Sequence, residues 1–355
     1  MSSHSLYGWF LSGGRYRRVR LQIPPGSSGN AVSGETPFDV EAAADPYHSF
    51  RYDYANDLTY AQTADRDERP LQVYEVSPAP SHTRPGRVLR SDGATFSAVA
   101  FGPSADGSAS LFAADPAGSR LYRLGPPTGA GAEASRNGTW TGFHDLAGRD
   151  VWAQHSIADL AIDVLEGHGN EPVPTAFVLS GPTFREQGET YLLIQRLQED
   201  EGPGPDVLKV PADVRKVGVD PDQSYAWLSG PDSRLCRVYL DGSGRVEPLD
   251  FACAGPAVFV RAGDTVWVVF MDSNTSVRCV DVAGKAAAFR ISAPDGGSVG
   301  SPLIGTGGAG RVWTLPGTDH GPSLYEWDIA QGRCTDLGVL NLPEDFVLVP
   351  DLDYR

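Results

Sequence analysis

Residues 213–340 contain one sequence pattern three times. The copies are SYAWLSGPDSRLCRVYLDG at 224–242, DTVWVVFMDSNTSVRCVDV at 264–282 and GRVWTLPGTDHGPSLYEWDI at 310–329. Each copy predicts a strand centred on a tryptophan (Trp227, Trp267, Trp313), a polar turn, a second strand and an acidic turn residue (Asp241, Asp281, Asp328). The tryptophans are 40 and 46 residues apart, a period typical of repeat folds whose unit is one four-stranded sheet.

The N-terminal sequence matches the same pattern but lacks its first strand. LYGWFLSGGRYRRVRLQ at 6–22 aligns with the copy that begins at 224, and Trp9 takes the place of Trp227. A lone apolar run near the C-terminus, EDFVLVP at 344–350, supplies a candidate for the missing strand. Pairing of this strand with residues 5–23 would build one sheet from both ends of the chain and close a ring, leaving no free sheet edge at the seam.

The rest of the chain fits the same plan. Residues 24–36 are interpreted as a loop rich in Gly, Ser and Pro, and 156–166 is compatible with a strand or a short amphipathic helix. First strands are predicted to begin near residues 48, 95, 157, 213, 257, 301 and 345. The sequence therefore predicts one domain, 1–355, made of seven four-stranded sheets.

This pattern resembles the broad class of seven-bladed β-propellers, with WD40, YVTN and streptogramin-lyase-like repeats. Trp327-Asp328 reproduces a WD dipeptide at the end of a third strand. The resemblance implies an all-β fold of four-stranded antiparallel blades around a central channel. The glycine–histidine signature of true WD40 repeats does not recur, so the resemblance is architectural and implies no family function.

Composition restricts the function classes. A formal net charge of −16 argues against nucleic acid or an anionic membrane as the main partner, because phosphate contacts need clustered Lys and Arg. The four cysteines form no CxxC motif, which disfavours a zinc ribbon or a redox site. The N-terminus lacks the features of a signal peptide, and no apolar run reaches membrane-spanning length. We expect a cytoplasmic protein without an organic cofactor, and a closed ring is compatible with a monomer.

Candidate site residues follow from the topology of such a fold. The segments that enter first strands and the loops between second and third strands gather at one face, where the channel opens and ligands usually bind. The histidines predicted at this face, as acid, base or metal ligands, are His48, His155 and His320. The predicted binding residues are Tyr47, Arg66, Arg185, Asp272, Asp319 and Asp345.

Three imidazoles from separate blades would suit acid–base chemistry near neutral pH or a divalent metal, with Asp319 or Asp345 as carboxylate partners. The alternative is that they are ordinary loop histidines. Two aspartate-containing segments, DPDQS at 220–224 and MDSNTS at 271–276, resemble oxygen-rich calcium loops. Neither has the full ligand spacing, and both also match tight turns.

Two hypotheses of function remain. The first is a binding platform for a small molecule, a peptide or a partner protein at the channel mouth, and it is narrowly favoured because it needs no special residues. The second is a lyase, hydrolase or cyclase that uses His48, His155 and His320, with Arg66 or Arg185 holding an anionic group of the substrate. A deep polar pocket with adjacent histidines would indicate the enzyme, and a flatter face with exposed apolar residues would indicate the platform.

Overall fold

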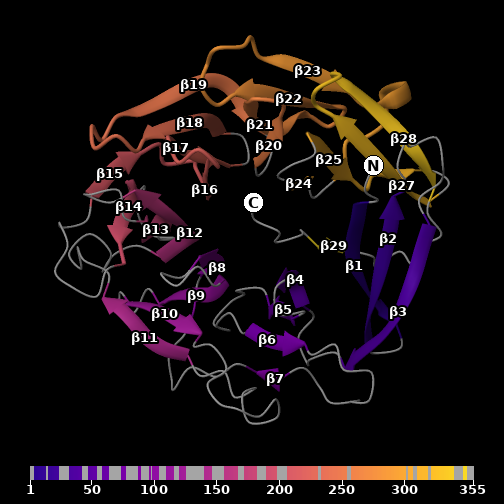
Figure 1. The fold of residues 1–355 in the computed structure, drawn as a ribbon, viewed down its shortest axis with the longest axis horizontal. Coiled ribbons are helices and arrows are strands. Elements are labelled where there is room, and N and C mark those ends of the chain that lie inside the picture. Colours follow the sequence, from indigo (N-terminus) through magenta and orange to yellow (C-terminus); the bar gives the residue numbers. More distant parts are fainter. Residues whose placement is uncertain are drawn as a thin grey trace. The chain divides into compact units, whose positions relative to one another are not determined.

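The computed structural model is nearly all β, and the described residues contain one short 3-10 turn, η1 (Pro294–Gly296) (Figure 1). The structure describes residues 4–12, 15–23, 32–41, 47–53, 58–63, 73–76, 87–88, 96, 98–103, 109–115, 120–124, 140–145, 156–166, 172–181, 189–197, 206–230, 233–253, 257–300, 303–306, 310–318, 321–339 and 347–349. Up to residue 88 this description concerns the backbone alone.

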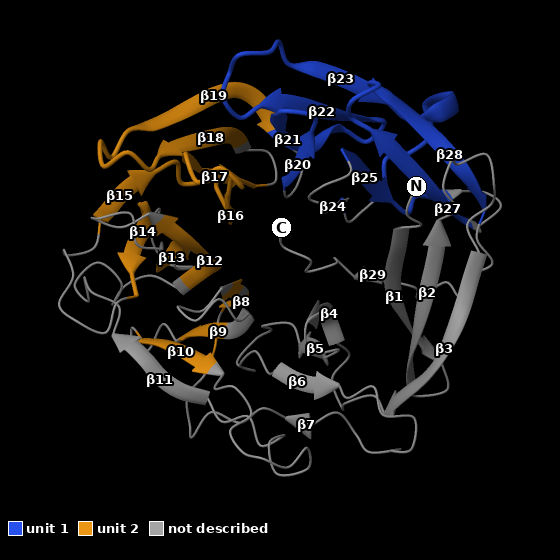
Figure 2. Cartoon of the chain, viewed as in Figure 1, with its two compact units in different colours: residues 1–63, 74–87, 253–355 blue, residues 64–73, 88–252 orange. Residues whose placement is uncertain are grey.

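The chain divides into two compact units, coloured separately in Figure 2. Unit 1 comprises residues 1–63, 74–87 and 253–355, and unit 2 comprises residues 64–73 and 88–252. Both units are built from antiparallel sheets in which neighbouring strands are mostly consecutive in the sequence. Short connections favour this order, because antiparallel strands can be joined by tight turns.

The described strands of unit 2 form four-stranded sheets, each with its strands in sequence order. The first contains β8 (Ala98–Pro103), β9 (Ala109–Asp115), β10 (Arg120–Leu124) and β11 (Trp140–Asp145). The second contains β12 (Ser156–Glu166), β13 (Pro172–Gly181), β14 (Thr190–Arg196) and β15 (Asp206–Val210). The third contains β16 (Lys216–Val219), β17 (Tyr225–Ser229), β18 (Ser233–Tyr239) and β19 (Val246–Cys253). The segment 156–166, for which strand and helix were both open, is therefore a strand.

Unit 1 holds two further sheets from the repeat region. One contains β20 (Val258–Ala262), β21 (Thr265–Ser273), β22 (Ser276–Asp281) and β23 (Phe289–Ser292). The other contains β24 (Ile304–Thr306), β25 (Arg311–Thr314), β27 (Gly321–Asp328) and β28 (Arg333–Val339), with the short β26 (Gly317–Thr318) paired to β27. A sheet of β4 (Tyr47–Asp53), β5 (Leu58–Thr63), β6 (Val73–Val76) and β7 (Arg87–Val88) lies mostly in this unit.

The two ends of the chain share one sheet of unit 1. Its order is β29 (Val347–Val349), β1 (His4–Ser12), β2 (Arg15–Ile23) and β3 (Val32–Glu41). Trp9 pairs with Val347, so the predicted pairing of the C-terminal and N-terminal strands is present. The expectation of a loop over 24–36 was wrong from Val32 onward, where β3 begins. Its sequence, VSGETPFDVE, lacks the strict apolar–polar alternation that would have predicted a strand.

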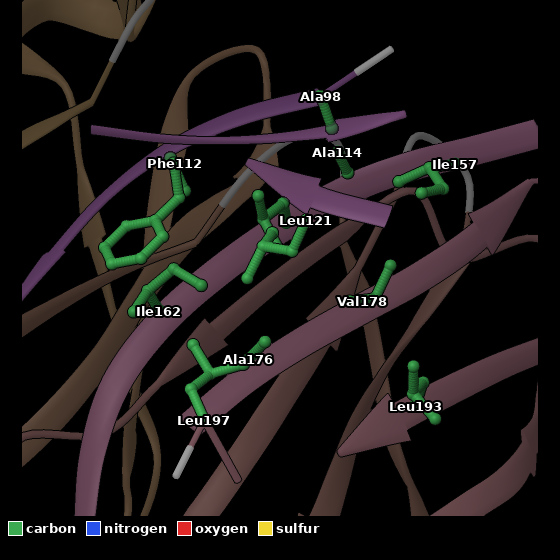
Figure 3. Packing of buried hydrophobic residues seen from close by; sticks show 12 residues of the cluster. Ala98, Phe112, Ala114, Leu121, Ile157, Ile162, Ala176, Val178, Leu193 and Leu197 are labelled. Carbon is green, nitrogen blue, oxygen red and sulfur yellow. The ribbon is translucent and has the colours of Figure 1, made fainter. Parts of the chain in front are cut away.

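The core of unit 2 lies between successive sheets. In Figure 3, Phe112 of β9, Leu121 of β10 and Ile162 of β12 belong to one cluster that joins the first two sheets. Gly102 of β8 permits this approach, since a Cβ atom there would lie 2.3 Å from the Cβ atom of Ile162. A second cluster joins the second and third sheets, and its buried members are Leu165, Phe177, Leu179, Leu192, Val210, Val214, Ala226, Leu228, Cys236 and Val238.

An ion pair also connects these last two sheets at their first strands. A bulge in β12 precedes Asp159. The Asp159 carboxylate accepts a hydrogen bond from the backbone N–H of Val217 at 2.9 Å and lies 3.2 Å from Nζ of Lys216, both in β16. Apolar packing and a specific polar contact thus fix the same pair of sheets.

The core of unit 1 joins the sheet β20–β23 to the sheet that contains β24, β25, β27 and β28. Val269 of β21, Cys279 of β22 and Trp327 of β27 belong to this cluster. On the other face of β21, Val268 and Phe270 are fully buried as well. Residues on both faces of β21 are therefore buried, which explains its continuous apolar run VWVVFM at 266–271.

The acidic residues of the repeat have a structural role at its turns. Asp281 accepts three backbone hydrogen bonds, from Ala283 at 2.9 Å, Lys285 at 2.8 Å and Ala286 at 2.6 Å. Asp241 and Asp328 likewise accept one from a residue two or three positions later in the chain. Asp recurs at the end of each third strand because it stabilises the turn that follows. Its carboxylate accepts hydrogen bonds from backbone N–H groups that are not paired with a neighbouring strand.

Candidate functional site

The structure locates three of the predicted site residues. Tyr47 and His48 are described at the backbone, and Asp272 is described in full. The remaining ones lie outside the described residues: His155, His320, Arg66, Arg185, Asp319 and Asp345. Convergence of the three histidines therefore stays a prediction.

His48 occupies an irregular position in β4, the first strand of its sheet. Tyr47 pairs with Thr63 and Ser49 pairs with Gln62, so the register shifts at His48. A bulge of this kind changes the direction of a side chain and is frequent next to active sites. Tyr47 is the first residue of β4, and the roles of Tyr47 and His48 in binding or catalysis stay predictions.

Around Asp272 the structure describes a complete stretch of the predicted face. The chain turns between β21 and β22 at Asn274 and Thr275, which are both exposed. The hydroxyl oxygens of Ser273 and Ser276 lie 2.7 Å apart across this turn, and Ser273 Oγ accepts a hydrogen bond from the N–H of Thr275 at 3.2 Å. Side-chain hydrogen bonds thus fix the loop between a second and a third strand.

The segment that leads from β23 into β24, residues 293–300, is attached to this turn. Ala293 donates its backbone N–H to the carbonyl oxygen of Thr275 at 2.8 Å, and Val299 donates to that of Asn274 at 2.7 Å. Between these two contacts Asp295 and Gly296 both have positive φ, 51° and 71°, and Gly297 donates to the carbonyl of Pro294 at 2.9 Å. These are the features of a tight turn of type I′.

The same segment contacts the next loop between a second and a third strand. Gly300 has φ +77°, and a Cβ atom at this position would lie 2.5 Å from the backbone nitrogen of Pro316. Glycine is therefore required there on two grounds, backbone conformation and space. These contacts join residues 273–276, 293–300 and 315–317, and we call this set of segments the loop face. It consists of the two kinds of segment that the topology predicted for a binding face.

A tyrosine hydroxyl lies directly beneath the loop face. The side chain of Tyr325 in β27 is 4% exposed, and a Cβ atom at Gly297 would lie 2.7 Å from its hydroxyl oxygen. This hydroxyl makes no hydrogen bond to any described residue. Burial, followed by the charges of Asp336, Cys334 and Asp295, raises the pKa of Tyr325. The phenol is therefore neutral at physiological pH and can act as a hydrogen-bond donor.

At the edge of the loop face, Asp272 holds two arginines. Nε of Arg278 lies 2.9 Å from Oδ1 of Asp272, its Nη2 lies 3.3 Å from Oδ2, and Arg290 forms an ion pair with the same Oδ2. The carboxylate side chain is 9% exposed. Burial acts to raise the pKa of Asp272, but the hydrogen bonds and charges of Arg278 and Arg290 outweigh it and lower the pKa.

The sequence pattern did not predict that Arg278, Arg290 and Tyr325 lie at this site. Arg278 and Arg290 are register partners on β22 and β23, so they lie side by side although twelve positions separate them in the chain. Knowing that both residues lie in strands does not show that Arg278 is opposite Arg290, because the register also depends on the length of the turn 282–288. The repeat pattern predicts Tyr325 only as a strand residue, because its position under Gly297 depends on the fold of segment 293–300.

The calcium-loop interpretation receives no support from the described residues. In the segment 220–224, the oxygens of the buried Asp220 accept backbone hydrogen bonds from Asp222 at 2.9 Å and Tyr225 at 2.5 Å. In the segment 271–276, Asp272 is paired with arginines. No group of three or more His, Cys, Asp or Glu residues in the described part of the chain is arranged to hold a metal ion. Nor does any helix there have the length and apolarity needed to cross a membrane.

Comparison with known proteins gives the fold class. No family model and no curated protein matches the sequence. Among solved structures, a protein from Lactobacillus plantarum is similar over 98% of both chains, with a TM-score of 0.52 and 14% identity. Puromycin hydrolase is similar over 95% of this chain and 54% of its own, with a TM-score of 0.52 and 15% identity.

Dihydro-heme d1 dehydrogenase NirN, solved in complex with DHE, is similar over 93% of this chain and 62% of its own, with a TM-score of 0.50 and 14% identity. The chain thus spans only part of the length of NirN and of puromycin hydrolase. These matches include β-propeller proteins. Together with the four-stranded antiparallel sheets and the cores between successive sheets, they show that the chain has a fold of the broad β-propeller class. At these identities the likeness concerns the fold alone.

Proposed function

We propose that this chain is a seven-bladed β-propeller, closed by the pairing of β29 with β1, and that it works as a binding platform. The ligand is a small molecule, a peptide or a partner protein, held at the channel mouth by the loop face and the equivalent segments of the other blades. This proposal includes a role for Tyr47, Arg66, Arg185, Asp272, Asp319 and Asp345 as binding residues.

The proposal rests on the contacts that hold the segments of the loop face together. Two backbone hydrogen bonds, Ala293 to Thr275 and Val299 to Asn274, join loops of successive sheets, and Gly300 packs against Pro316. A surface whose polar groups are already held in place loses little conformational entropy when a ligand binds. Asn274, Thr275, Asp295 and Ser298 are exposed on it and present hydrogen-bonding side chains.

Site-directed substitution on the loop face tests this proposal. Thr275→Trp and Ser298→Trp place bulky side chains at exposed positions of the face, so they should abolish ligand binding while the protein stays folded. Lys285→Trp is the matched control, because residue 285 is exposed in the turn at the opposite end of β22. Ligands that bind the wild type and all three variants equally would place binding elsewhere and refute the platform at this face.

A second candidate function is catalysis by His48, His155 and His320, as a lyase, hydrolase or cyclase. The bulge at His48 favours it, because such irregularities accompany active sites. The test is the metal content of tag-free protein, measured for the wild type and for His48→Ala, His155→Ala and His320→Ala. Stoichiometric metal that is lost in at least two variants would establish one shared site. Metal content that none of the three substitutions changes would refute a metal centre built from these histidines.

A further inference from the structure

Tyr325 has a buried hydroxyl group that forms no hydrogen bond with the part of the chain that the structure describes. The residue is only 4% exposed. Other tyrosine hydroxyls bond to carboxylates: that of Tyr191 donates to Glu189, and that of Tyr239 donates to Glu247 at 2.7 Å. A buried polar group without a partner costs folding free energy, so the hydroxyl of Tyr325 has hydrogen-bonding capacity that the described fold does not use.

The backbone next to this hydroxyl leaves room for it. Gly297 has φ −63° and ψ 167°, a conformation that every residue can adopt. Backbone conformation therefore does not require glycine there, but space does. A Cβ atom at this position would lie 2.7 Å from the hydroxyl oxygen of Tyr325 and 3.2 Å from the carbonyl oxygen of Pro294. The lack of a side chain at Gly297 thus keeps the space next to the hydroxyl unfilled.

Negative charge lies close to the same hydroxyl. Asp336 of β28 is the register partner of Tyr325, so the two side chains lie on the same face of the sheet. Asp295 lies two residues before Gly297, and both aspartates are exposed. Burial raises the pKa of Tyr325 most, and Asp336, Cys334 and Asp295 raise it further. Burial also raises the pKa of Cys334 to about 12, so at neutral pH the negative charge comes from the two aspartates.

Both carboxylates can accept further hydrogen bonds. Oδ1 of Asp336 accepts one from Oγ of Ser323 at 2.6 Å and one from the backbone N–H of Gly338 at 2.7 Å, whereas its Oδ2 bonds to no described residue. The Asp295 side chain forms neither a hydrogen bond nor an ion pair with a described residue. An ionised carboxylate has about four acceptor sites, so most of this capacity is available to a ligand.

We propose that the hydroxyl of Tyr325, together with Asp295 and Asp336, forms a subsite for a cationic group, either a primary ammonium or a guanidinium. Such a group carries a positive charge and several N–H donors, which complement two carboxylates and a phenol oxygen. The phenol oxygen accepts one of these hydrogen bonds, and its own proton remains available to an acceptor elsewhere on the same ligand. The formal net charge of −16 also attracts cations to the protein.

This subsite goes beyond the proposed binding platform. It is formed by the turn η1, the residue that follows it and the last two long strands of the sheet, β27 and β28. The ligand of the platform is proposed at the channel mouth, which first strands such as β24 would line. The two sites are therefore tested separately, with different probes.

The test is an NMR titration of the full-length chain, labelled with ¹³C-tyrosine, with n-butylammonium and n-butylguanidinium at constant ionic strength. The ring signal of Tyr325, assigned through Tyr325→Phe, should shift saturably with one of these cations. It should not shift with n-butanol or butyrate, which have the same alkyl chain without the positive charge. The preferred cation then shows whether the ligand group is an ammonium or a guanidinium.

Variants of the charged and polar groups should change the affinity for that cation. Ligand-observed NMR should show that Tyr325→Phe, Asp295→Asn and Asp336→Asn each weaken its binding by about tenfold. Asp264→Asn is the matched control, because it removes the same charge from an exposed residue in the turn between β20 and β21, at the opposite end of its sheet. It should retain the wild-type affinity.

Gly297→Ala tests the space next to the hydroxyl. Its Cβ atom should fill this space and abolish binding of the cation. Gly317→Ala lies outside the subsite and adds a Cβ atom with no other atom within 4 Å, so it should bind the cation like the wild type. The thermal unfolding midpoint of Gly297→Ala should rise when Tyr325→Phe is added, because removal of the hydroxyl relieves the collision.

The inference would be overturned by equal shifts with n-butylammonium and n-butanol, or by the lack of a saturable shift with either cation. Equal affinities of Gly297→Ala and Gly317→Ala for the cation would also overturn it, as would equal losses in Asp336→Asn and Asp264→Asn. Because each probe is applied without another ligand, these outcomes do not depend on whether a ligand binds at the channel mouth.

Discussion

The backbone N–H of Val299 donates a hydrogen bond to the carbonyl oxygen of Asn274 at a distance of 2.7 Å. Through this bond, the segment that enters one sheet is attached to a turn of the preceding sheet. Contacts of this kind hold the segments of the loop face together. Substitution of its residues with positive φ or close backbone contacts should therefore affect both stability and binding.

Substitution of Gly300 should disturb these contacts more than any other substitution considered for the loop face. Gly300→Ala combines an unfavourable positive φ with a collision against Pro316, and we expect a loss of about 2–4 kcal/mol in the free energy of unfolding. Gly296→Ala is the matched control: its φ is +71°, but no atom lies within 4 Å of the added Cβ. It should cost about 1 kcal/mol. Chemical denaturation measures both, and equal losses would show that Gly300 has no packing role.

Tyr325→Phe distinguishes a ligand-binding hydroxyl from a structural one. Because the Tyr325 hydroxyl bonds to no described residue, its removal should change the free energy of unfolding by less than about 0.5 kcal/mol. It should also weaken the binding of a loop-face ligand that accepts a hydrogen bond. A loss of about 1 kcal/mol or more without ligand would mean that the hydroxyl stabilises the fold, and would remove it from the site.

The hydroxyl group of Thr314 should stabilise the folded protein. Thr314 Oγ1 accepts a hydrogen bond from the indole N–H of Trp327 at 2.9 Å, and both side chains are fully buried. Thr314→Val leaves that N–H without a partner, so we expect a loss of about 1–3 kcal/mol. Thr335→Val on the neighbouring β28 is the control. Equal thermal unfolding midpoints for the two variants would contradict the importance of this bond.

Cys236, Cys279 and Cys334 should be unreactive in the native protein. No disulfide joins them, and burial raises the pKa of Cys236 to about 11 and the pKa values of Cys279 and Cys334 to about 12. Only a thiolate reacts with iodoacetamide, so these three residues should remain unlabelled at pH 8 and become labelled in denaturant. Rapid labelling of the native protein, located by peptide mass mapping, would show that the blades open locally.

Asp272 should contribute a stability that depends on pH. Its pKa is lowered in the folded protein, so the unfolded chain takes up the proton first as the pH falls. The contribution is therefore complete above about pH 4, the ordinary pKa of aspartate, and is lost as the pH falls through the lowered folded value. The difference in unfolding free energy between wild type and Asp272→Asn should shrink below about pH 4. A difference that stays constant from pH 7 to pH 2 would refute the ion-pair account.

The sequence predicted much of the fold because the repeat is strongly patterned. Tryptophans at equivalent positions, such as Trp227 and Trp313, identify second strands, and both are buried. Cys236 and Cys279, expected to be core residues, are buried in successive clusters. The strand β3 was missed because its residues alternate poorly. Weak period-two patterning gives no strand signal, and pairing with β2 then determines the structure.

The candidate site was predictable only in outline. Asp272 lies next to the turn between β21 and β22, and its role as a binding residue stays a prediction. The arginines that surround it come from β22 and β23, and the hydroxyl under Gly297 comes from β27. These side chains are brought together by strand register and by the packing of one sheet on the next. Residue spacing within a single sequence does not contain that information.

Affinity-selection mass spectrometry would show whether the loop face binds a ligand. A library of anionic, neutral and cationic small molecules and short peptides would be applied to the wild type, the double variant Thr275→Trp/Ser298→Trp, and Lys285→Trp. We predict that the wild type and Lys285→Trp retain the same compounds and that the double variant retains none of them. Retention of the same compounds by all three proteins, or of none by the wild type, would contradict a binding platform at this face.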